Sequence, residues 1–144
     1  MSGFLLDTNI PSEIGKPVPQ PSVLRWLGTV EETQTFLSVV SLGEMRKGCE
    51  LLEPGSKRRL QLERWLENDV HKWLAGRILP VTEAIADRWG KLEAQRQRLG
   101  LPLNTADGQI AATAIEHGLT LVTRNLKDFS GLGVTLLSPW DDTP

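Results

Sequence analysis

Short apolar runs alternate with longer amphipathic stretches along the chain. The apolar runs have the length of strands and lie at 4–6, 35–40, 78–81, 119–122 and 134–137. Between them, apolar residues recur at the three- and four-residue spacing that is typical of helices. Short apolar strands that alternate with helices predict an α/β fold in which both faces of a parallel sheet are covered.

The expected helices begin at capping residues and end at glycine or proline. The first has Pro11 in its first turn, the second is capped by Ser22, and the third is opened by Ser41–Glu44 and stopped by Pro54-Gly55. The longest pattern covers 57–75 and ends before Gly76. Two more helices follow: one from Thr82 to Leu99, before Gly100, and one that is capped by Asn104 or Thr105 and ends at Gly118.

The length of 144 residues suits one domain that spans 1–144. The chain contains no apolar run long enough to span a membrane, and its N-terminus lacks the basic region of a signal peptide. The one cysteine, Cys49, excludes an intramolecular disulfide and fits a buried helix position in a reducing compartment. We therefore expect a cytoplasmic protein. The net charge of −2 argues against passive binding of duplex nucleic acid, but not against an enzyme that holds phosphate through a metal.

Acidic residues stand where the predicted strands end. Asp7 ends the first strand, Glu44 lies in the first turn after the second, and Asp107 lies in the first turn of the helix before the 119–122 strand. Three further polar residues follow that strand: Thr123, Asn125 and Asp128. Because ligands of open parallel sheets bind beyond the carboxyl ends of the strands, we expect these side chains to meet in one cavity.

Three carboxylates in one cavity are costly without a cation. Two like charges about 5 Å apart repel by roughly 3 kcal/mol at an effective dielectric near 20, and a hard divalent ion removes this cost. Oxygen ligands without a Cys or His cluster favour Mg²⁺, with Mn²⁺ as a substitute, over Zn²⁺. Such an ion activates water and stabilises the departing oxygen of a phosphodiester. Asn125 can hold a metal-bound water without adding charge.

Each acid also has a structural interpretation when it is taken alone. Asp7-Thr8-Asn9 is good turn chemistry, and Ser41 and Glu44 have the spacing of a capping box. Asp107 can complement a helix dipole, and Asp128 can be an exposed loop acid. Their shared placement at one edge of the sheet favours the functional interpretation.

Four segments, in order, resemble the PIN domains and, within them, the VapC/FitB-like toxins. They are 4–9 (FLLDTN), 38–48 (SVVSLGEMRKG), 106–112 (ADGQIAA) and 121–129 (LVTRNLKDF). The closing segment 136–140 (LLSPW) is similar to the end of the FitB-like branch. The resemblance therefore covers nearly the whole chain. It implies an α/β/α sandwich around a five-stranded parallel sheet and a metal-dependent endoribonuclease that cuts cellular RNA and stops growth.

The resemblance also implies roles for single residues. Asp7, Glu44 and Asp107 match the acidic core of the family, with Asp7 and Asp107 as the usual direct Mg²⁺ ligands. Two hydroxyl positions of the active site match Thr8 and Thr123.

At the position of a fourth acid in many relatives, this chain has Asn125. This departure leaves the occupancy of a second metal site open, although Asp128 can compensate. VapC-like toxins typically form dimers and are silenced by a co-expressed antitoxin, whose C-terminal segment wraps the toxin and blocks the site.

Other residues carry weaker signals. His71 and His117 lie apart from the carboxylate motifs, and Trp65 and Trp73 favour packing in the core or a dimer over base stacking. Two basic runs fit either RNA backbone contacts or a solvated helix surface: Arg46-Lys47 and Lys57-Arg58-Arg59. The 57–75 helix has more apolar positions than a small sheet needs, which predicts self-association.

Two other functions fit parts of the sequence. A haloacid-dehalogenase-like phosphatase also places an aspartate after an apolar strand, but it needs a second acid two residues later, where this chain has Asn9. An inactive module that keeps the fold and only binds RNA or protein is the second alternative. The intact set of Asp7, Glu44 and Asp107 argues against it.

Overall fold

The computed structural model describes residues 3–140, and a five-stranded parallel sheet forms its centre. The strands are β1 (Phe4–Leu6), β2 (Thr35–Ser38), β3 (Ile78–Leu79), β4 (Thr120–Val122) and β5 (Leu136–Leu137), in the order β3-β2-β1-β4-β5. All four pairings are parallel, so the carboxyl ends of the strands lie at one edge. The predicted α/β class and the five-stranded parallel sheet are confirmed.

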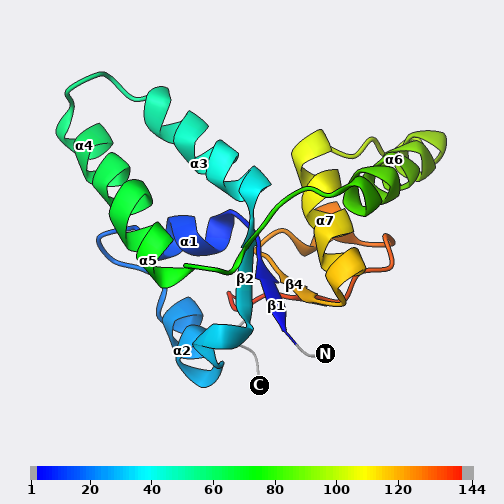
Figure 1. The fold of residues 1–144 in the computed structure, drawn as a ribbon, viewed down its shortest axis with the longest axis horizontal. Coiled ribbons are helices and arrows are strands. Elements are labelled where there is room, and N and C mark those ends of the chain that lie inside the picture. The colour runs from blue at the N-terminus through cyan, green and yellow to red at the C-terminus, as the bar shows by residue number, and fades with distance from the viewer. Residues whose placement is uncertain (1–2, 141–144) are drawn as a thin grey trace.

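Helices cover both faces of this sheet. They are α1 (Asn9–Ile14), α2 (Pro21–Thr29), α3 (Val39–Glu50), α4 (Lys57–Arg64), a π-helical turn (Trp65–Val70), α5 (His71–Trp73), α6 (Glu83–Arg98) and α7 (Thr105–His117), with short 3₁₀ turns at Glu32–Gln34 and Leu126–Phe129. In Figure 1, α3 and α4 rise on one side of the sheet, and α6 and α7 lie on the other. Within 3–140, no helix is both long and apolar enough to cross a membrane.

Neighbouring residues of the central strands face two separate cores. Leu5 and Leu121 pack with α6 and α7, whereas Leu6 and Val122 pack with α1, α3 and the turn after α4. All four side chains are fully buried. This explains the continuous apolar runs, because strands buried on both faces have no solvent side for polar residues. Cys49 is buried in the α3 core, as predicted.

Two helix starts differ from the prediction. The second strand ends at Ser38, whose hydroxyl accepts a hydrogen bond from the Val40 amide and so caps α3 two residues before the predicted end of the strand. Ser41 is therefore a buried residue inside α3, and Glu44 lies in the second helical turn. Likewise α2 begins at Pro21, so Ser22 is not its cap. The caps predicted at Thr82 and Asn104 are confirmed.

The predicted 57–75 helix is interrupted by the π turn at Trp65–Val70. Its buried residues Leu66, Val70 and Leu74 recur every four positions, a spacing wider than the 3.6-residue α-helical repeat, which suits a locally wider winding. The strands predicted over 78–81 and 134–137 are both shorter, with two residues each.

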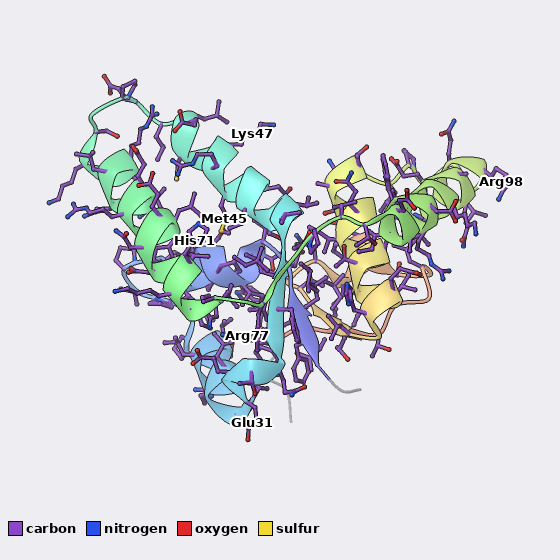
Figure 2. All side chains as sticks on the ribbon, viewed as in Figure 1. Glu31, Met45, Lys47, His71, Arg77 and Arg98 are labelled. Atoms are coloured by element: carbon purple, nitrogen blue, oxygen red, sulfur yellow. The ribbon has the colours of Figure 1, made fainter. Side chains whose placement is uncertain are left out.

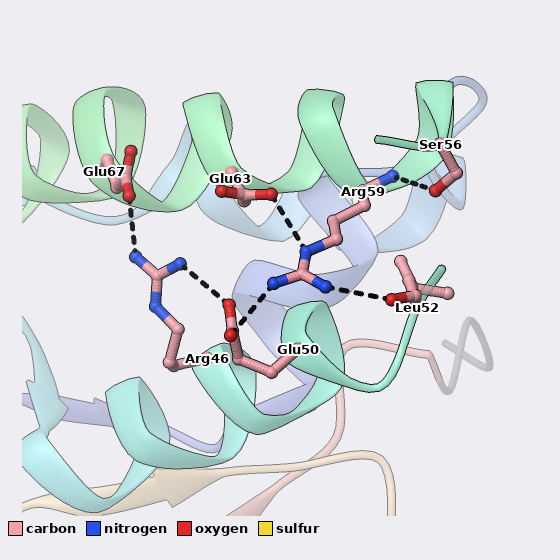
Figure 3. Close-up of polar contacts among 7 residues, drawn as sticks. All are labelled: Arg46, Glu50, Leu52, Ser56, Arg59, Glu63 and Glu67. Atoms are coloured by element: carbon pink, nitrogen blue, oxygen red, sulfur yellow. Dashed lines mark hydrogen bonds and ion pairs between the residues drawn. The ribbon is translucent and has the colours of Figure 1, made fainter. Parts of the chain in front are cut away.

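Ion pairs join α3 and α4 into a hairpin (Figure 3). Arg59 lies 2.9 Å from Glu50 and 3.1 Å from Glu63, and Arg46 lies 2.9 Å from Glu67. The guanidinium of Arg59 also donates to the carbonyl of Leu52. These two arginines are therefore engaged within the protein, which weakens the suggestion that they contact RNA.

Arg77 joins the start of β3 to the segment before β2. Its guanidinium donates to the carbonyl oxygens of Glu32, Thr35 and Trp73, and its backbone carbonyl accepts from the Leu37 amide. Its guanidinium also contacts the side chains of Thr35 and Glu32. Nothing in the sequence pattern marked this residue, because most of its partners are backbone carbonyls.

We expect Arg77→Met to lower the free energy of unfolding by about 2 kcal/mol, since it removes the donor from the carbonyls of buried Thr35 and half-buried Trp73. Urea unfolding measures this, with Arg98→Met as the control at an exposed position. Arg77 lies at the amino ends of the strands, away from the acidic residues, so RNA binding by the folded fraction should not change. An unfolding midpoint equal to that of the control would contradict the assigned role.

Candidate active site

Asp7 directly follows β1 at the carboxyl edge of the sheet. Its amide donates to the carbonyl of Val122, which holds the backbone between β1 and β4. Its carboxylate accepts from the Thr8 amide at 2.8 Å and from the Thr123 hydroxyl at 2.7 Å, with the Asn9 amide at 3.4 Å. Asp7 is only 5% exposed. It is thus a buried and oriented carboxylate rather than a solvated turn residue.

Glu44 reaches this edge from α3. Its Oε1 accepts a hydrogen bond from the Thr8 hydroxyl at 2.5 Å, and the Thr8 oxygen also lies 2.9 Å from the Ser41 hydroxyl. The side chain of Glu44 is exposed. Thr8 therefore connects the end of β1 to the second turn of α3, and the capping-box interpretation of Ser41 and Glu44 is wrong.

Asp107 lies in the first turn of α7. The Asn104 side chain accepts hydrogen bonds from the amides of Ala106 and Asp107 and so fixes this turn. Gly108 follows at a close approach of α6, where an added Cβ would lie 2.7 Å from Cδ1 of Trp89. Packing against α6 thus determines where Asp107 stands.

Seven polar side chains line one open cavity of about 300 Å³: Asp7, Thr8, Asn9, Ser12, Glu44, Asp107 and Asn125. Thr123 lies behind it and bonds to Asp7 and to the Asn125 amide. The expected meeting of Asp7, Glu44, Asp107 and Asn125 is thus observed. Asp128 does not line this cavity; it shares a neighbouring depression with Asp107 and Asn104.

The acids of the cavity disfavour one another's ionisation. Burial, with the negative charges of Asp7, Glu44 and Asp128, raises the pKa of Asp107 to about 6. Burial also raises the pKa of Asp7, against the hydrogen bonds from Thr123 and Thr8, and the charges of Glu44 and Asp128 add to the rise. A bound cation would favour the ionised form of both groups.

The donor set fits a hard cation, because every candidate ligand is an oxygen. Across residues 3–140, no three acidic, histidine or cysteine side chains already stand as a preformed metal site. Glu44 accepts a hydrogen bond from the Thr8 hydroxyl, and Asp7 accepts one from the Thr123 hydroxyl.

Three residues of the cavity region were not predicted from the sequence as site residues. Asn9 bonds to Asp7 and to the Arg124 amide, Ser12 lines the cavity, and Ser41 contacts Thr8. The signal for Asn9 and Ser12 was their position on the short helix directly after Asp7, which places them beside it. His71 and His117 are exposed and do not line the cavity, in agreement with the prediction.

A second, mostly apolar groove of about 370 Å³ opens beside the cavity. The two share Thr8, Ser12 and Glu44. The groove runs between α3 and the α4 helix with its π turn, and Met45, Leu62 and Trp65 are among its lining residues. Lys16 and Arg58 add two cations to it.

Comparisons with known proteins cover almost the whole chain. The family model described as PIN domain matches residues 4–133. Toxin FitB of Neisseria gonorrhoeae is 38% identical over 96% of this chain and 99% of its own length. The VapC ribonuclease Y4jK of Sinorhizobium fredii is 36% identical over 96% of this chain and 98% of its own. Among solved structures, FitAB bound to the IR36 DNA fragment superposes with a TM-score of 0.88, at 34% identity and 98% coverage of both chains.

Proposed function

This chain belongs to the PIN-domain family and to its VapC/FitB-like toxins of toxin–antitoxin systems, and we propose that it cuts RNA through a divalent cation held by Asp7, Glu44 and Asp107. The observation that carries the proposal is the cavity in which these three carboxylates meet, with the pKa of Asp107 raised to about 6 by burial and by its acidic neighbours. A cluster with only a structural role has no need for acids that disfavour one another's ionisation. A site that binds a cation needs such acids as ligands.

The residues of the cavity have distinct roles in this proposal. Asp7 and Asp107 would hold Mg²⁺, or Mn²⁺ in its place, and Glu44 completes the acidic set. A cation held there would supply the means to activate a water and to stabilise negative charge on the leaving oxygen of the phosphodiester. Thr123 orients the Asp7 carboxylate, Thr8 orients Glu44, and Asn125 offers an uncharged amide to a water or to the RNA backbone.

Cleavage of single-stranded RNA by the purified protein tests the function. We expect cutting with Mg²⁺ or Mn²⁺, loss of cutting with EDTA, and recovery when the metal is restored. Hydrolysis of a chromogenic phosphate monoester without RNA cleavage would favour the phosphatase alternative. RNA binding without cleavage under any divalent ion would favour the inactive module. Sequencing of RNA ends after brief expression would identify the target.

We further propose that the cognate antitoxin occupies the apolar groove between α3 and α4. Its support is the position of the groove, which shares Thr8, Ser12 and Glu44 with the acidic cavity. A peptide in the groove would therefore also cover the entrance to the carboxylates. The apolar side chains of the groove suit a peptide with large apolar residues, and Lys16 and Arg58 suit acidic ones.

A substitution that fills the groove should leave RNA cleavage intact and weaken inhibition by the antitoxin. Gly48 lies on the groove with no atom within 4 Å of an added Cβ, so Gly48→Leu should fit the folded toxin but obstruct the antitoxin. We expect RNA cleavage near the wild-type rate and at least about tenfold weaker protection by the antitoxin. Gly43→Leu is the matched control, because Gly43 is equally open on α3 and does not line the groove. Equal protection of both variants would exclude the groove.

We also propose that the toxin is a homodimer that acts in the cytoplasm, where its RNA substrate is. Trp65 and Trp73 pack against the core beside α3 rather than projecting freely, but Leu51 and Leu60 are exposed around the tip of the α3–α4 hairpin. Light scattering that finds only a 16.0 kDa species at micromolar concentration would contradict self-association.

A further inference from the structure

The carboxyl edge of the sheet also carries a cation next to the acidic cavity. Arg124 follows β4 between Thr123 and Asn125, and its side chain is exposed. Its guanidinium carbon lies 5.5 Å from the centre of the Trp140 ring. Because β5 pairs with β4, Trp140 reaches this position three residues after β5 ends. An arginine over a tryptophan ring is held by a cation–π contact that leaves its N–H donors free.

The backbone of Arg124 is fixed as well. Its amide donates to Oδ1 of Asn9, and the adjoining Thr123 amide donates to the carbonyl of Leu137. The residue is thus tied to α1 on one side and to β5 on the other. A cation held this firmly costs little conformational entropy when it binds a ligand.

Arg124 has no carboxylate partner among residues 3–140. Hydrogen bonds from Lys16 and the Gln20 amide lower the pKa of Glu13, and the charge of Arg124 adds a smaller lowering; Glu13 lies four residues after Asn9 on the same face of α1. Both carboxylate oxygens of Glu13 are already taken, one by Lys16 at 2.9 Å and one by the Gln20 amide at 2.9 Å. Among the described residues, therefore, no acidic side chain competes with an external anion for the guanidinium of Arg124.

The negative charges of the acidic cavity repel the RNA backbone, and a positively charged side chain beside the cavity reduces this repulsion. The cavity presents Asp7, Glu44 and Asp107, with Asp128 nearby, and one divalent ion compensates only two of these charges. An RNA backbone that approaches the cavity meets residual negative charge. Binding of a polyanion requires cations beside the acids. Lys16 and Arg58 lie in the neighbouring apolar groove, and Arg96 lines the depression that holds Asp128, whereas Arg124 directly precedes Asn125 of the cavity itself.

We propose that Arg124, positioned by the ring of Trp140, binds a phosphate of the RNA strand next to the phosphate that is cut. The inference rests on the proposed ribonuclease function. The strand then crosses the cavity toward β5, with Arg124 on the side of the cavity opposite Glu44. A fork of N–H donors suits phosphate oxygens, and the half-buried ring of Trp140, which packs against the core beside α3, supports the guanidinium.

The test measures RNA binding apart from cleavage. A fluorescently labelled single-stranded RNA is titrated with protein in EDTA at several salt concentrations. We expect Arg124→Gln to weaken binding about five- to tenfold and to reduce the slope of log affinity against log salt by roughly one contact. Arg124→Lys should keep the slope but recover only part of the affinity, because a lysine does not stack on the ring.

Two further variants complete the test. Trp140→Leu should weaken RNA binding about threefold without altering the salt slope, since the cation remains but is no longer positioned. Arg98→Gln is the matched control, because Arg98 is exposed at the far end of α6 (Figure 2) and should bind RNA as the wild type does. In cleavage assays, Arg124→Gln should raise KM more than it changes kcat.

Four results would overturn the inference. In the first, Arg124→Gln binds RNA as tightly as Arg98→Gln does. In the second and third, Arg124→Gln loses only thermal stability, or only affinity for the antitoxin, and keeps its RNA affinity. In the fourth, the wild-type protein has no measurable RNA affinity. The proposed function fails separately. If the wild type binds RNA through Arg124 but never cuts it with Mg²⁺ or Mn²⁺, the ribonuclease assignment falls and the binding role of Arg124 stands.

Discussion

Replacement of Asp7 with Asn should reduce RNA cleavage a hundredfold or more and leave the protein folded. Asn keeps the size of the side chain and can still accept from Thr123 or Thr8, but a neutral amide is a much poorer ligand for Mg²⁺. A hundredfold loss corresponds to about 2.7 kcal/mol of transition-state stabilisation. If Asp7 were only a turn residue, Asn would serve nearly as well, because both favour turns.

Stability separates the two interpretations further. Asp7 is a buried carboxyl whose pKa is raised by burial, so removal of its charge should maintain or increase the free energy of unfolding without metal. Asp69→Asn is the control, since Asp69 is exposed on the π turn after α4. An Asp7→Asn protein that cuts RNA at the wild-type rate at limiting Mg²⁺ would remove Asp7 from the metal site.

Replacement of Asp107 with Asn should have a similarly large effect on cleavage and a pH-dependent effect on stability. The pKa of Asp107 is raised from 3.8 to about 6, so the folded protein holds this proton more tightly than the unfolded chain does. Its contribution to stability is fully present below pH 3.8 and is lost as the pH rises through about 6. The wild type therefore carries an unfavourable charge at neutral pH that the Asn variant lacks.

In EDTA at pH 7.5, we expect Asp107→Asn to be more stable than the wild type by about 1 kcal/mol, a figure reduced from the full shift because the side chain is partly exposed. Near pH 4 the two proteins should unfold at nearly the same temperature. Mg²⁺ should stabilise the wild type and have less effect on the variant. A stability difference that is the same at both pH values would show that the charge of Asp107 is not the cause.

The sequence pattern was sufficient for the sheet because its strands are buried on both faces. Leu5 and Leu6 face different cores, so β1 has no polar position, and Asp7 marks its end. The same logic predicted the carboxyl edge as the place where Asp7, Glu44 and Asp107 would meet. Each of these acids stands at or near the carboxyl end of a strand or at the first turn of a helix, where local sequence is informative.

Features that depend on distant contacts were not accessible from the pattern. Ser38 and Ser41 are both plausible caps for α3, and only the hydrogen bond from the Val40 amide to the Ser38 hydroxyl shows which of them caps the helix. The apolar positions of the 57–75 segment also fit a continuous α-helix, so the pattern predicted a helix there but not the π turn at Trp65–Val70. Asp128 follows β4, as the sequence indicated. It lies in the 3₁₀ turn at Leu126–Phe129, however, and lines the neighbouring depression instead of the cavity.

RNA cleavage is expected to depend on a divalent ion held in the carboxylate cavity. Electron paramagnetic resonance of Mn²⁺ measures ion binding directly, and RNA cleavage can be followed in the same samples of wild type, Asp7→Asn, Asp107→Asn and the Asp69→Asn control. We predict that the wild type and the control bind Mn²⁺ and cut RNA, whereas both site variants bind Mn²⁺ at least about tenfold more weakly and lose cleavage in parallel. Undiminished Mn²⁺ binding by both site variants, or wild-type cleavage that persists in EDTA, would contradict the account.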